Sequence, residues 1–306
     1  MDYVYLVAGL IGLFFGGEAL VRGSVGIARR LAIPPLLIGL TVVGFGTSTP
    51  ELLVSVDAAW RGVPDIALGN IIGSNIANIL LIVGLTALVW PITVMGATLR
   101  RDTLVMVAAA VVLVPIFALG FMARLSGIIL VAGLVGYLVW AYRTPGDAAA
   151  EDDTLPAPSS TLHSVLWVIG GLVVLMVGAR FLVDGSVNIA RGFGVSEAFI
   201  GLTIVAVGTS LPELATSLIA AFRRQSEIAI GNIVGSNIFN VLGILGITAV
   251  ITPIPVADRF LSFDLPVMIA VSLVLTALLL TRPQIGRWMG VALLAGYLAY
   301  VLAAQG

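Results

Sequence analysis

Two glutamates, Glu51 and Glu213, lie inside long apolar stretches of the chain, and each directly follows a proline. A threonine hydroxyl precedes each by four residues, at Thr47 and Thr209, which places hydroxyl and carboxylate on one helix face. An ionised carboxylate in an apolar environment is costly unless it is paired, and the surrounding stretches offer no basic residue at matching depth. The partner of each carboxylate is therefore a proton or a bound cation.

The segments around both glutamates occur twice in the sequence. Residues 39–52 read GLTVVGFGTSTPEL and residues 201–214 read GLTIVAVGTSLPEL, with ten of fourteen positions identical. A second motif follows each copy, GNIIGSNIANI at 69–79 and GNIVGSNIFNV at 231–241, with eight of eleven identical. All matching positions are separated by 162 residues, which indicates a duplication in which both copies kept the same polar side chains.

The second motif adds neutral oxygen donors to the carboxylates and threonine hydroxyls. These donors are Ser74, Ser236, Asn78 and Asn240. Oxygen-only sets suit hard cations, and Ca²⁺ takes about six to eight such ligands in a flexible cage. Zinc and copper prefer imidazole and thiolate, but the chain has no cysteine and its single histidine lies outside the repeated motifs. The charge of the two carboxylates can be balanced by one divalent ion or by Na⁺ ions spread over the same oxygens. Competition between these two kinds of cation for one site is the physical basis for exchanging one against the other.

Composition places the chain in a lipid bilayer. Of its 306 residues, 59% are hydrophobic and 10% are charged, and the mean hydropathy is +1.14. Apolar runs of roughly 18 residues or more recur along it, as in transmembrane helices. The net charge of −1 gives no basis for nucleic-acid binding. The N-terminus lacks a basic stretch and a cleavage site, so we interpret it as the first span rather than a signal peptide.

We predict an all-α integral membrane protein with ten transmembrane helices. The predicted spans are 3–21, 34–59, 66–90, 103–121, 124–142, 163–182, 195–221, 227–251, 260–281 and 284–303. They form two halves, 1–142 and 163–306, joined by a linker at 143–162 that is too short for a folded domain. Because five spans is an odd number, the second half enters the membrane from the opposite side. We therefore predict inverted five-helix repeats with the site between them near the midplane.

The arginines indicate how the predicted helices are oriented in the membrane, and the prolines indicate where two of them break. Ten of the fifteen arginines lie in loops on the linker side of the membrane, which places the linker in the cytoplasm and both termini outside. Pro50 and Pro212 each remove a backbone donor in mid-span, so the second and seventh helices are predicted to break. Broken backbone at membrane depth survives where it lines a cavity. Freed carbonyls are expected at Gly44, Thr47, Ala206 and Thr209, and weaker interruptions at 73–75 and 235–237.

The motifs G-T-S-x-P-E and G-N-x-x-G-S-N-[IV]-x-N, each present twice, resemble the α-repeats of the sodium/calcium exchanger family, within the calcium/cation antiporter superfamily. The resemblance covers almost the whole chain and is to the prokaryotic type without a large regulatory loop. It implies a Na⁺/Ca²⁺ antiporter of the cell membrane with alternating access. Ca²⁺ and Na⁺ would be the transported substrates, with no organic cofactor, and we expect a monomer.

The resemblance also implies roles for individual residues. Thr47, Glu51, Thr209 and Glu213 would form the Ca²⁺ site, with Asn78 and Asn240 at the centre. The implied additional Na⁺ contacts are Gly44, Ser48, Ser74, Ala206, Ser210 and Ser236, with Gly44 and Ala206 acting through their carbonyls. Some relatives carry aspartate at the position of Asn240. The asparagine here removes that third carboxylate and disfavours K⁺ cotransport.

Other functions fit parts of the pattern. A H⁺/Ca²⁺ or other cation exchanger needs only the two glutamates, whereas Na⁺ coupling needs the hydroxyls that both repeats carry. A cation channel fits less well, because a channel filter usually lies on a rotational axis. An enzyme is not expected, since the membrane lacks a usable histidine and the chain has no lysine. The structural alternatives are a protonated glutamate bonded to freed backbone, and interhelical hydrogen bonds for Asn78 and Asn240.

The first and sixth spans are expected to slide together over the other eight and to seal the two mouths of the site in turn. Both spans are rich in glycine, which permits close packing. We expect their glycines to form the sliding surface, at Gly9, Gly12, Gly16, Gly17, Gly170, Gly171 and Gly178.

Overall fold

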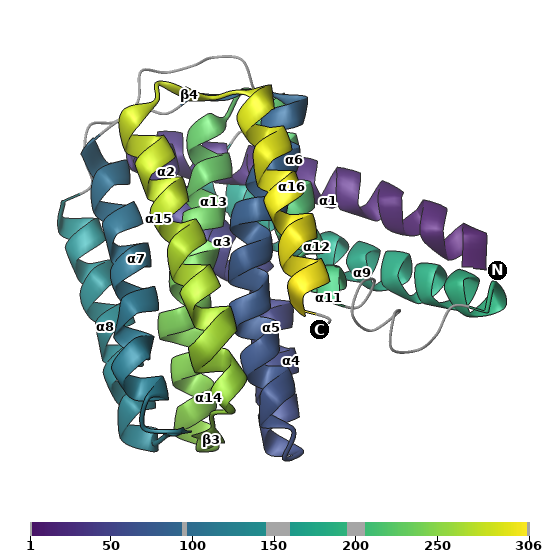
Figure 1. Cartoon of the computed structure of the whole chain (residues 1–306). Helices are drawn as coiled ribbons and strands as arrows, with labels where there is room; N and C mark the ends of the chain where they lie inside the picture. The colour runs from purple at the N-terminus through teal and green to yellow at the C-terminus, as the bar shows by residue number, and fades with distance from the viewer. Residues whose placement is uncertain (1, 94–96, 145–159, 195–205, 305–306) are drawn as a thin grey trace.

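The computed structural model describes residues 2–93, 97–144, 160–194 and 206–304, and nearly all of them are helical (Figure 1). The first half comprises α1 (Asp2–Leu31), α2 (Pro35–Ile38), η1 (Gly39–Val43), α3 (Gly44–Thr47), α4 (Thr49–Trp60), α5 (Pro64–Ala77), η2 (Asn78–Ile82), α6 (Val83–Val89), β1 (Ile92–Thr93), α7 (Ala97–Phe117), β2 (Phe121–Met122) and α8 (Arg124–Arg143). The second half comprises α9 (Thr161–Gly192), α11 (Ala206–Gly208), α12 (Leu211–Phe222), α13 (Ser226–Ile238), η4 (Phe239–Leu245), α14 (Gly246–Ile251), β3 (Ile254–Pro255), η5 (Phe260–Asp264), α15 (Leu265–Thr281), β4 (Gln284–Ile285) and α16 (Arg287–Ala304). The elements labelled η are π-helical turns.

The described residues include seven helices long and apolar enough to cross a membrane, and an eighth span if a bent helix pair counts as one. Two of the ten predicted spans, 103–121 and 195–221, are not among these helices and remain predictions. α7 carries three charged residues, 100–102, near its start, and α12 has only 12 residues, while 195–205 lie outside the described part. The continuous spans α5–α6 and α13–α14 have 78% and 83% of their most apolar window buried, against 11% for α16. The two spans that carry the second motif therefore form the centre of the bundle.

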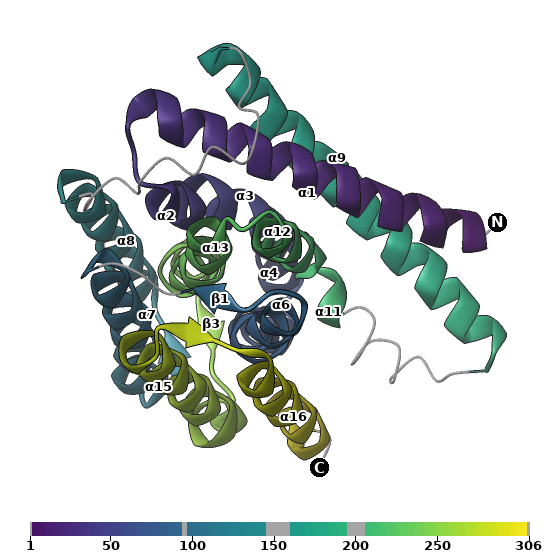
Figure 2. The same cartoon turned by 90° about the horizontal axis from the view of Figure 1, so that it is seen from above.

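α1 and α9 lie side by side along their length and run obliquely across the bundle (Figures 1 and 2). Both extend ten residues beyond the predicted ends at 21 and 182. α1 continues because its charges are paired: Glu18 is buried and accepts from Arg22 (2.6 Å) and from Arg223 at the end of α12 (2.7 Å). Ion pairing offsets the cost of burying these side chains.

The glycines of α1 and α9 differ from the expectation of a sliding surface. A β-carbon on Gly16 would lie 2.7 Å from the backbone nitrogen of Leu175, and one on Gly178 would lie 2.8 Å from that of Leu13. These glycines therefore bring the two helices into backbone contact with each other. Gly17 is an exception that faces the bundle, with Ile219 of α12 beside it. Most of the predicted sliding surface instead joins the two helices into one unit.

The predicted break of the second span is confirmed. The segment Pro35–Thr47 bends by 44° into α4, with Ser48 at the joint and Pro50 in the first turn of α4. Proline lacks the backbone N–H of a continuous helix, but it fits a first turn, where that N–H has no intrahelical acceptor. In the second half, α11 ends at Gly208 and α12 begins at Leu211, so the chain is also interrupted before Pro212.

The second motif was expected to interrupt its helices at 73–75 and 235–237, and this was wrong. α5 and α13 are regular there, and the irregularity begins later, as the π-helical turns η2 at Asn78 and η4 at Phe239. A π-turn inserts an extra residue into the helix and shifts the side chains that follow. Asn78 and Asn240 therefore sit where regular helical geometry gives way.

Two short antiparallel strand pairs link the halves at the ends of the bundle. Ile92 and Thr93 of β1 pair with Ile285 and Gln284 of β4, while Phe121 and Met122 of β2 pair with Pro255 and Ile254 of β3. Ile92 and Ile254 are equivalent positions, as are Met122 and Gln284. Each strand pair therefore joins a strand of one half to a strand of the other. The second pair consists of the equivalent strands from the opposite halves.

Substituting Gly235 with alanine is expected to destabilise the fold by about 1–3 kcal/mol, the usual cost of overpacking. A β-carbon there would clash with the carbonyl oxygen of Leu40, where α13 crosses the broken span. The matched control is Gly73→Ala at the equivalent position, where a β-carbon meets no described atom within 4 Å. Thermal unfolding in detergent should show a lower Tm for Gly235→Ala alone. Equal Tm values for the two variants would contradict this packing argument.

Candidate cation site

The two glutamates of the repeated motif are buried near the break in each half, with 1% exposure each. Each accepts a hydrogen bond from a serine of the opposite half. Ser48 Oγ donates to Glu213 Oε1 (2.8 Å), and Ser210 Oγ donates to Glu51 Oε1 (3.2 Å). Because Ser48 and Glu51 are three residues apart, as are Ser210 and Glu213, this exchange brings the two breaks together.

Four side-chain oxygens at this place have no hydrogen-bond donor among the described residues. They are Glu51 Oε2, Glu213 Oε2, Asn78 Oδ1 and Asn240 Oδ1, and all four residues are buried. Burying an acceptor without a partner costs roughly 1–3 kcal/mol, and more for a charged group. An arrangement that gathers two carboxylate and two amide oxygens without donors matches the ligand chemistry of a hard cation.

The described residues hold no group of three or more histidine, aspartate or glutamate side chains suited to a metal ion. The centre combines two carboxylates with neutral oxygens. Fewer charges favour weaker cation binding than a carboxylate-rich cage provides, because ligand charge is one of the factors that set cation affinity. Such a centre suits an ion that must bind and then leave.

The threonines contact a pair of asparagines that the sequence analysis did not single out. Thr47 Oγ1 donates to Asn232 Oδ1 (3.1 Å), and Thr209 Oγ1 donates to Asn70 Oδ1 (3.4 Å). Asn232 Nδ2 in turn donates to the backbone carbonyl of Glu213 (3.1 Å), and Asn70 Nδ2 does the same for Glu51 (3.2 Å). These asparagines connect the threonine of one half with the glutamate segment of the other.

A sequence signal for this pair was available. Asn70 and Asn232 are the second residues of the repeated GNI motifs, 162 residues apart. Their amides also donate to Ser55 and Ser217, both at 2.9 Å, and these serines are another equivalent pair. Hydroxyl and amide side chains that recur at the repeat offset would have identified them.

The remaining predicted ligands lie around this centre. Ser74 Oγ lies 3.4 Å from Ser210 Oγ, and Ser236 Oγ donates to the Gly44 carbonyl (3.2 Å). The backbone N–H of Ser48 also donates to this carbonyl (3.2 Å), so the break does not leave it free of donors as expected. Ala206 begins α11, where the described residues resume.

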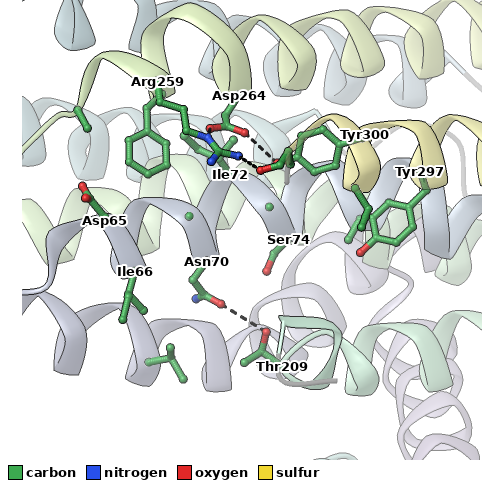
Figure 3. A pocket seen from close by; sticks show the side chains of 18 residues that line it. Asp65, Ile66, Asn70, Ile72, Ser74, Thr209, Arg259, Asp264, Tyr297 and Tyr300 are labelled. Atoms are coloured by element: carbon green, nitrogen blue, oxygen red, sulfur yellow. Dashed lines mark hydrogen bonds and ion pairs between the residues drawn. The ribbon is translucent and has the colours of Figure 1, made fainter. Parts of the chain in front are cut away.

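A cavity of about 550 Å³ reaches one flank of the site. Its lining includes Asn70, Ser74 and Thr209 at one end (Figure 3). At the other end lie Arg259 and Asp264, which form an ion pair at 3.2 Å. The cavity therefore connects polar groups of the site with charged groups near the end of the bundle.

Comparison with known proteins agrees with the geometry. The family model described as "Sodium/calcium exchanger protein" matches residues 1–143 and 163–305. The putative antiporter CaxA of Alkalimonas amylolytica is 39% identical over 97% of this chain and 96% of its own length. The sodium/calcium exchanger MaX1 of Methanosarcina acetivorans is 33% identical over 99% of this chain and 98% of its own. The Ca²⁺/H⁺ antiporter ChaA of Bacillus subtilis is 28% identical over 89% of this chain and 83% of its own.

Solved structures give the same result. A structure of the sodium–calcium exchanger NCX_Mj, soaked with zero Na⁺ and Ca²⁺, matches with a TM-score of 0.87 and 34% identity, covering 99% of this chain and 98% of that one. The apolar helices, the buried oxygen centre and these similarities define a multi-pass membrane transporter, an antiporter of cations that include Ca²⁺. The chain belongs to the sodium/calcium exchanger protein family.

Proposed function

We propose that the protein exchanges Na⁺ for Ca²⁺ across the cell membrane by alternating access. The observation that carries the proposal is the set of four donorless oxygens on Glu51, Glu213, Asn78 and Asn240. Without a cation, two buried carboxylates would face each other with one unsatisfied oxygen each, which is strongly unfavourable. One Ca²⁺ neutralises both charges, and Na⁺ ions compete for the same oxygens.

Further oxygen donors around the glutamates are proposed to bind Na⁺. We assign Thr47 and Thr209 to the Ca²⁺ position, beside the glutamates. The additional Na⁺ contacts are Ser48, Ser74, Ser210, Ser236 and the carbonyls of Gly44 and Ala206. Both serines that bond the glutamate carboxylates are in this set, so an ion that draws a carboxylate away also frees a hydroxyl oxygen.

The halves are proposed to be inverted five-helix repeats, residues 1–142 and 163–306, with a cytoplasmic linker and both termini outside. Paired contacts support this: the threonine–asparagine and serine–glutamate bonds across the halves each occur twice, 162 residues apart and with the halves exchanged. Such an exchange is what a twofold axis in the membrane plane produces. We take the protein to be a monomer, because the site uses ligands from both halves of one chain.

A second function, H⁺/Ca²⁺ exchange, is favoured by the relative named a Ca²⁺/H⁺ antiporter. Protons need only the two carboxylates, so this function predicts no role for the serine hydroxyls. The serines at Glu51 and Glu213 are better explained by Na⁺, whose charge must be shared among several oxygens. We therefore rank Na⁺ coupling first.

A flux measurement separates the two functions. Purified protein in liposomes should take up ⁴⁵Ca²⁺ when an outward Na⁺ gradient is imposed, with internal and external pH clamped equal. Replacing the Na⁺ gradient by a K⁺ gradient should give no uptake, and protein-free liposomes are the control. Uptake that follows a pH gradient and ignores Na⁺ would replace the Na⁺ proposal with H⁺/Ca²⁺ exchange.

A further inference from the structure

A second layer of buried side chains lies behind the asparagines of the site. Asn240 Nδ2 donates to Asn75 Oδ1 (3.2 Å), and Asn75 Nδ2 donates to the sulfur of Met268 (3.4 Å). All three side chains are at most 2% exposed. The result is a directed chain of hydrogen bonds that ends on a thioether.

The equivalent residues form the same chain with the halves exchanged. Asn78 Nδ2 donates to Asn237 Oδ1 (3.0 Å), and Asn237 Nδ2 donates to the sulfur of Met106 (3.6 Å) and to the carbonyl of Asn75 (3.5 Å). Met106 and Met268 are themselves 162 residues apart, although they lie outside both repeated motifs. The arrangement is therefore part of the duplicated design.

The thioether of Met268 determines which way the amide of Asn75 points. Met106 shares this role at Asn237 with the carbonyl of Asn75, which also accepts from Asn237 Nδ2. A methionine sulfur accepts a hydrogen bond but has no hydrogen to donate. The Nδ2 of Asn75 must face Met268, so the Oδ1 of Asn75 faces Asn240. Asn240 therefore donates to this oxygen with its own Nδ2. The Oδ1 of Asn240 is thereby left over, and it is one of the four donorless oxygens of the site.

Sulfur also suits this place because it does not compete for the ion. Na⁺ and Ca²⁺ are hard cations that prefer oxygen, whereas thioethers select soft metals. A hydroxyl or carboxylate at Met268 would be a rival ligand behind the site. The methionine supplies an acceptor and an apolar surface at the same time.

The position of each sulfur is fixed from one helical turn away. Asp102, four residues before Met106, is buried and accepts from the hydroxyl of Tyr137 (3.1 Å). Asp264 stands in the same relation to Met268 and accepts from a tyrosine hydroxyl at 3.0 Å. Both aspartates are also paired with arginines, so the two methionine-bearing turns are anchored to the neighbouring helices.

We propose that Met106 and Met268 are positioning residues that, through Asn237 and Asn75, turn the oxygens of Asn78 and Asn240 toward the transported cation. The inference rests on the proposed function, because it deepens the same site. Loss of the sulfur acceptor lets the amides rotate, which presents N–H groups to a positive ion. The effect is on ion affinity rather than on the conformational step.

The test compares Met268→Leu, Met106→Leu and the double variant with wild type in Ca²⁺ flux in liposomes. Leucine keeps the apolar bulk and removes the acceptor. Met268→Leu should raise the half-saturating Ca²⁺ concentration about five-fold, as loss of one hydrogen bond predicts. Met106→Leu should raise it less, because Asn237 Nδ2 keeps the carbonyl of Asn75 as an acceptor. Both variants should leave the maximal rate within about two-fold.

The control is Met122→Leu, since Met122 is fully buried in β2 and takes part in neither chain of hydrogen bonds. An unchanged half-saturating concentration in both leucine variants would overturn the proposal, as would an equal change in Met122→Leu. Ca²⁺ titration of protein labelled with ¹³C at the methionine methyls gives a second readout. The Met106 and Met268 signals should shift and that of Met122 should not. A wild type that transports no Ca²⁺ would refute the proposed function, and methyl signals that ignore Ca²⁺ would refute the positioning role.

Discussion

Glu213→Gln is expected to abolish Ca²⁺ transport, with the flux reduced at least about 100-fold. Substitutions behind a metal's own ligands already cost about 10- to 100-fold in affinity or activity. Glu213→Gln removes half the negative charge of the centre and replaces an oxygen that has no hydrogen-bond donor with an N–H₂ group. Glutamine keeps the acceptor for Ser48 at the Oε1 position, so the fold should survive. Glu51→Gln should behave alike, because Ser210 plays the equivalent part.

The measurement is the Na⁺-driven ⁴⁵Ca²⁺ flux, normalised to the amount of folded protein in the liposomes. Asp57→Asn is the matched control. It removes a carboxylate from the same helix as Glu51, but Asp57 is exposed and paired with Arg61 at 2.8 Å. Its flux should equal that of wild type. If Glu213→Gln retained Ca²⁺ exchange, the assignment of the site would be wrong.

A disulfide between α9 and α11 is expected to stop turnover almost completely. A β-carbon on Gly208 would lie 3.7 Å from Cβ of Val183, within the range of about 3.5–4.5 Å that disulfides require. The chain has no cysteine, so Val183→Cys with Gly208→Cys can form only this bridge within a molecule. If α1 and α9 move as a unit against the rest during alternating access, the bridge holds the protein in one state.

Flux should be lost after oxidation and recovered after reduction, which controls for any effect of the two substitutions themselves. Full activity of the oxidised α9–α11 variant would rule out relative motion at this contact.

The helical fold was predictable because apolar run length and mid-span proline act locally. Pro50 indicated a break within two residues of Ser48, where the 44° bend occurs. Helix ends were harder, because the last ten residues of α1 follow a buried glutamate, Glu18, whose partner Arg223 comes from a distant segment. Hydropathy counts such charges as unfavourable, and only the folded chain supplies their partners.

The members of the site were predictable, but their bonds were not. The spacing predicted Thr47 and Glu51 on one helix face, and this was wrong, because the 44° bend at Ser48 leaves Thr47 in α3 and Glu51 in α4. The spacing also could not reveal that Ser48 bonds the glutamate of the opposite half. That contact depends on how two distant breaks meet. The π-helical turn at Asn78 was missed for a related reason, because it follows from packing between helices rather than from glycine or proline in the motif.

The reciprocal serine bonds have a consequence for a divided chain. A fragment that ends before the linker would contain Glu51 but lack Ser210, and the complementary fragment would contain Glu213 but lack Ser48. Each fragment alone would carry a buried acid without its hydroxyl partner. Cutting the linker should therefore be tolerated only while both pieces remain together, so co-expressed fragments should regain transport that neither possesses by itself.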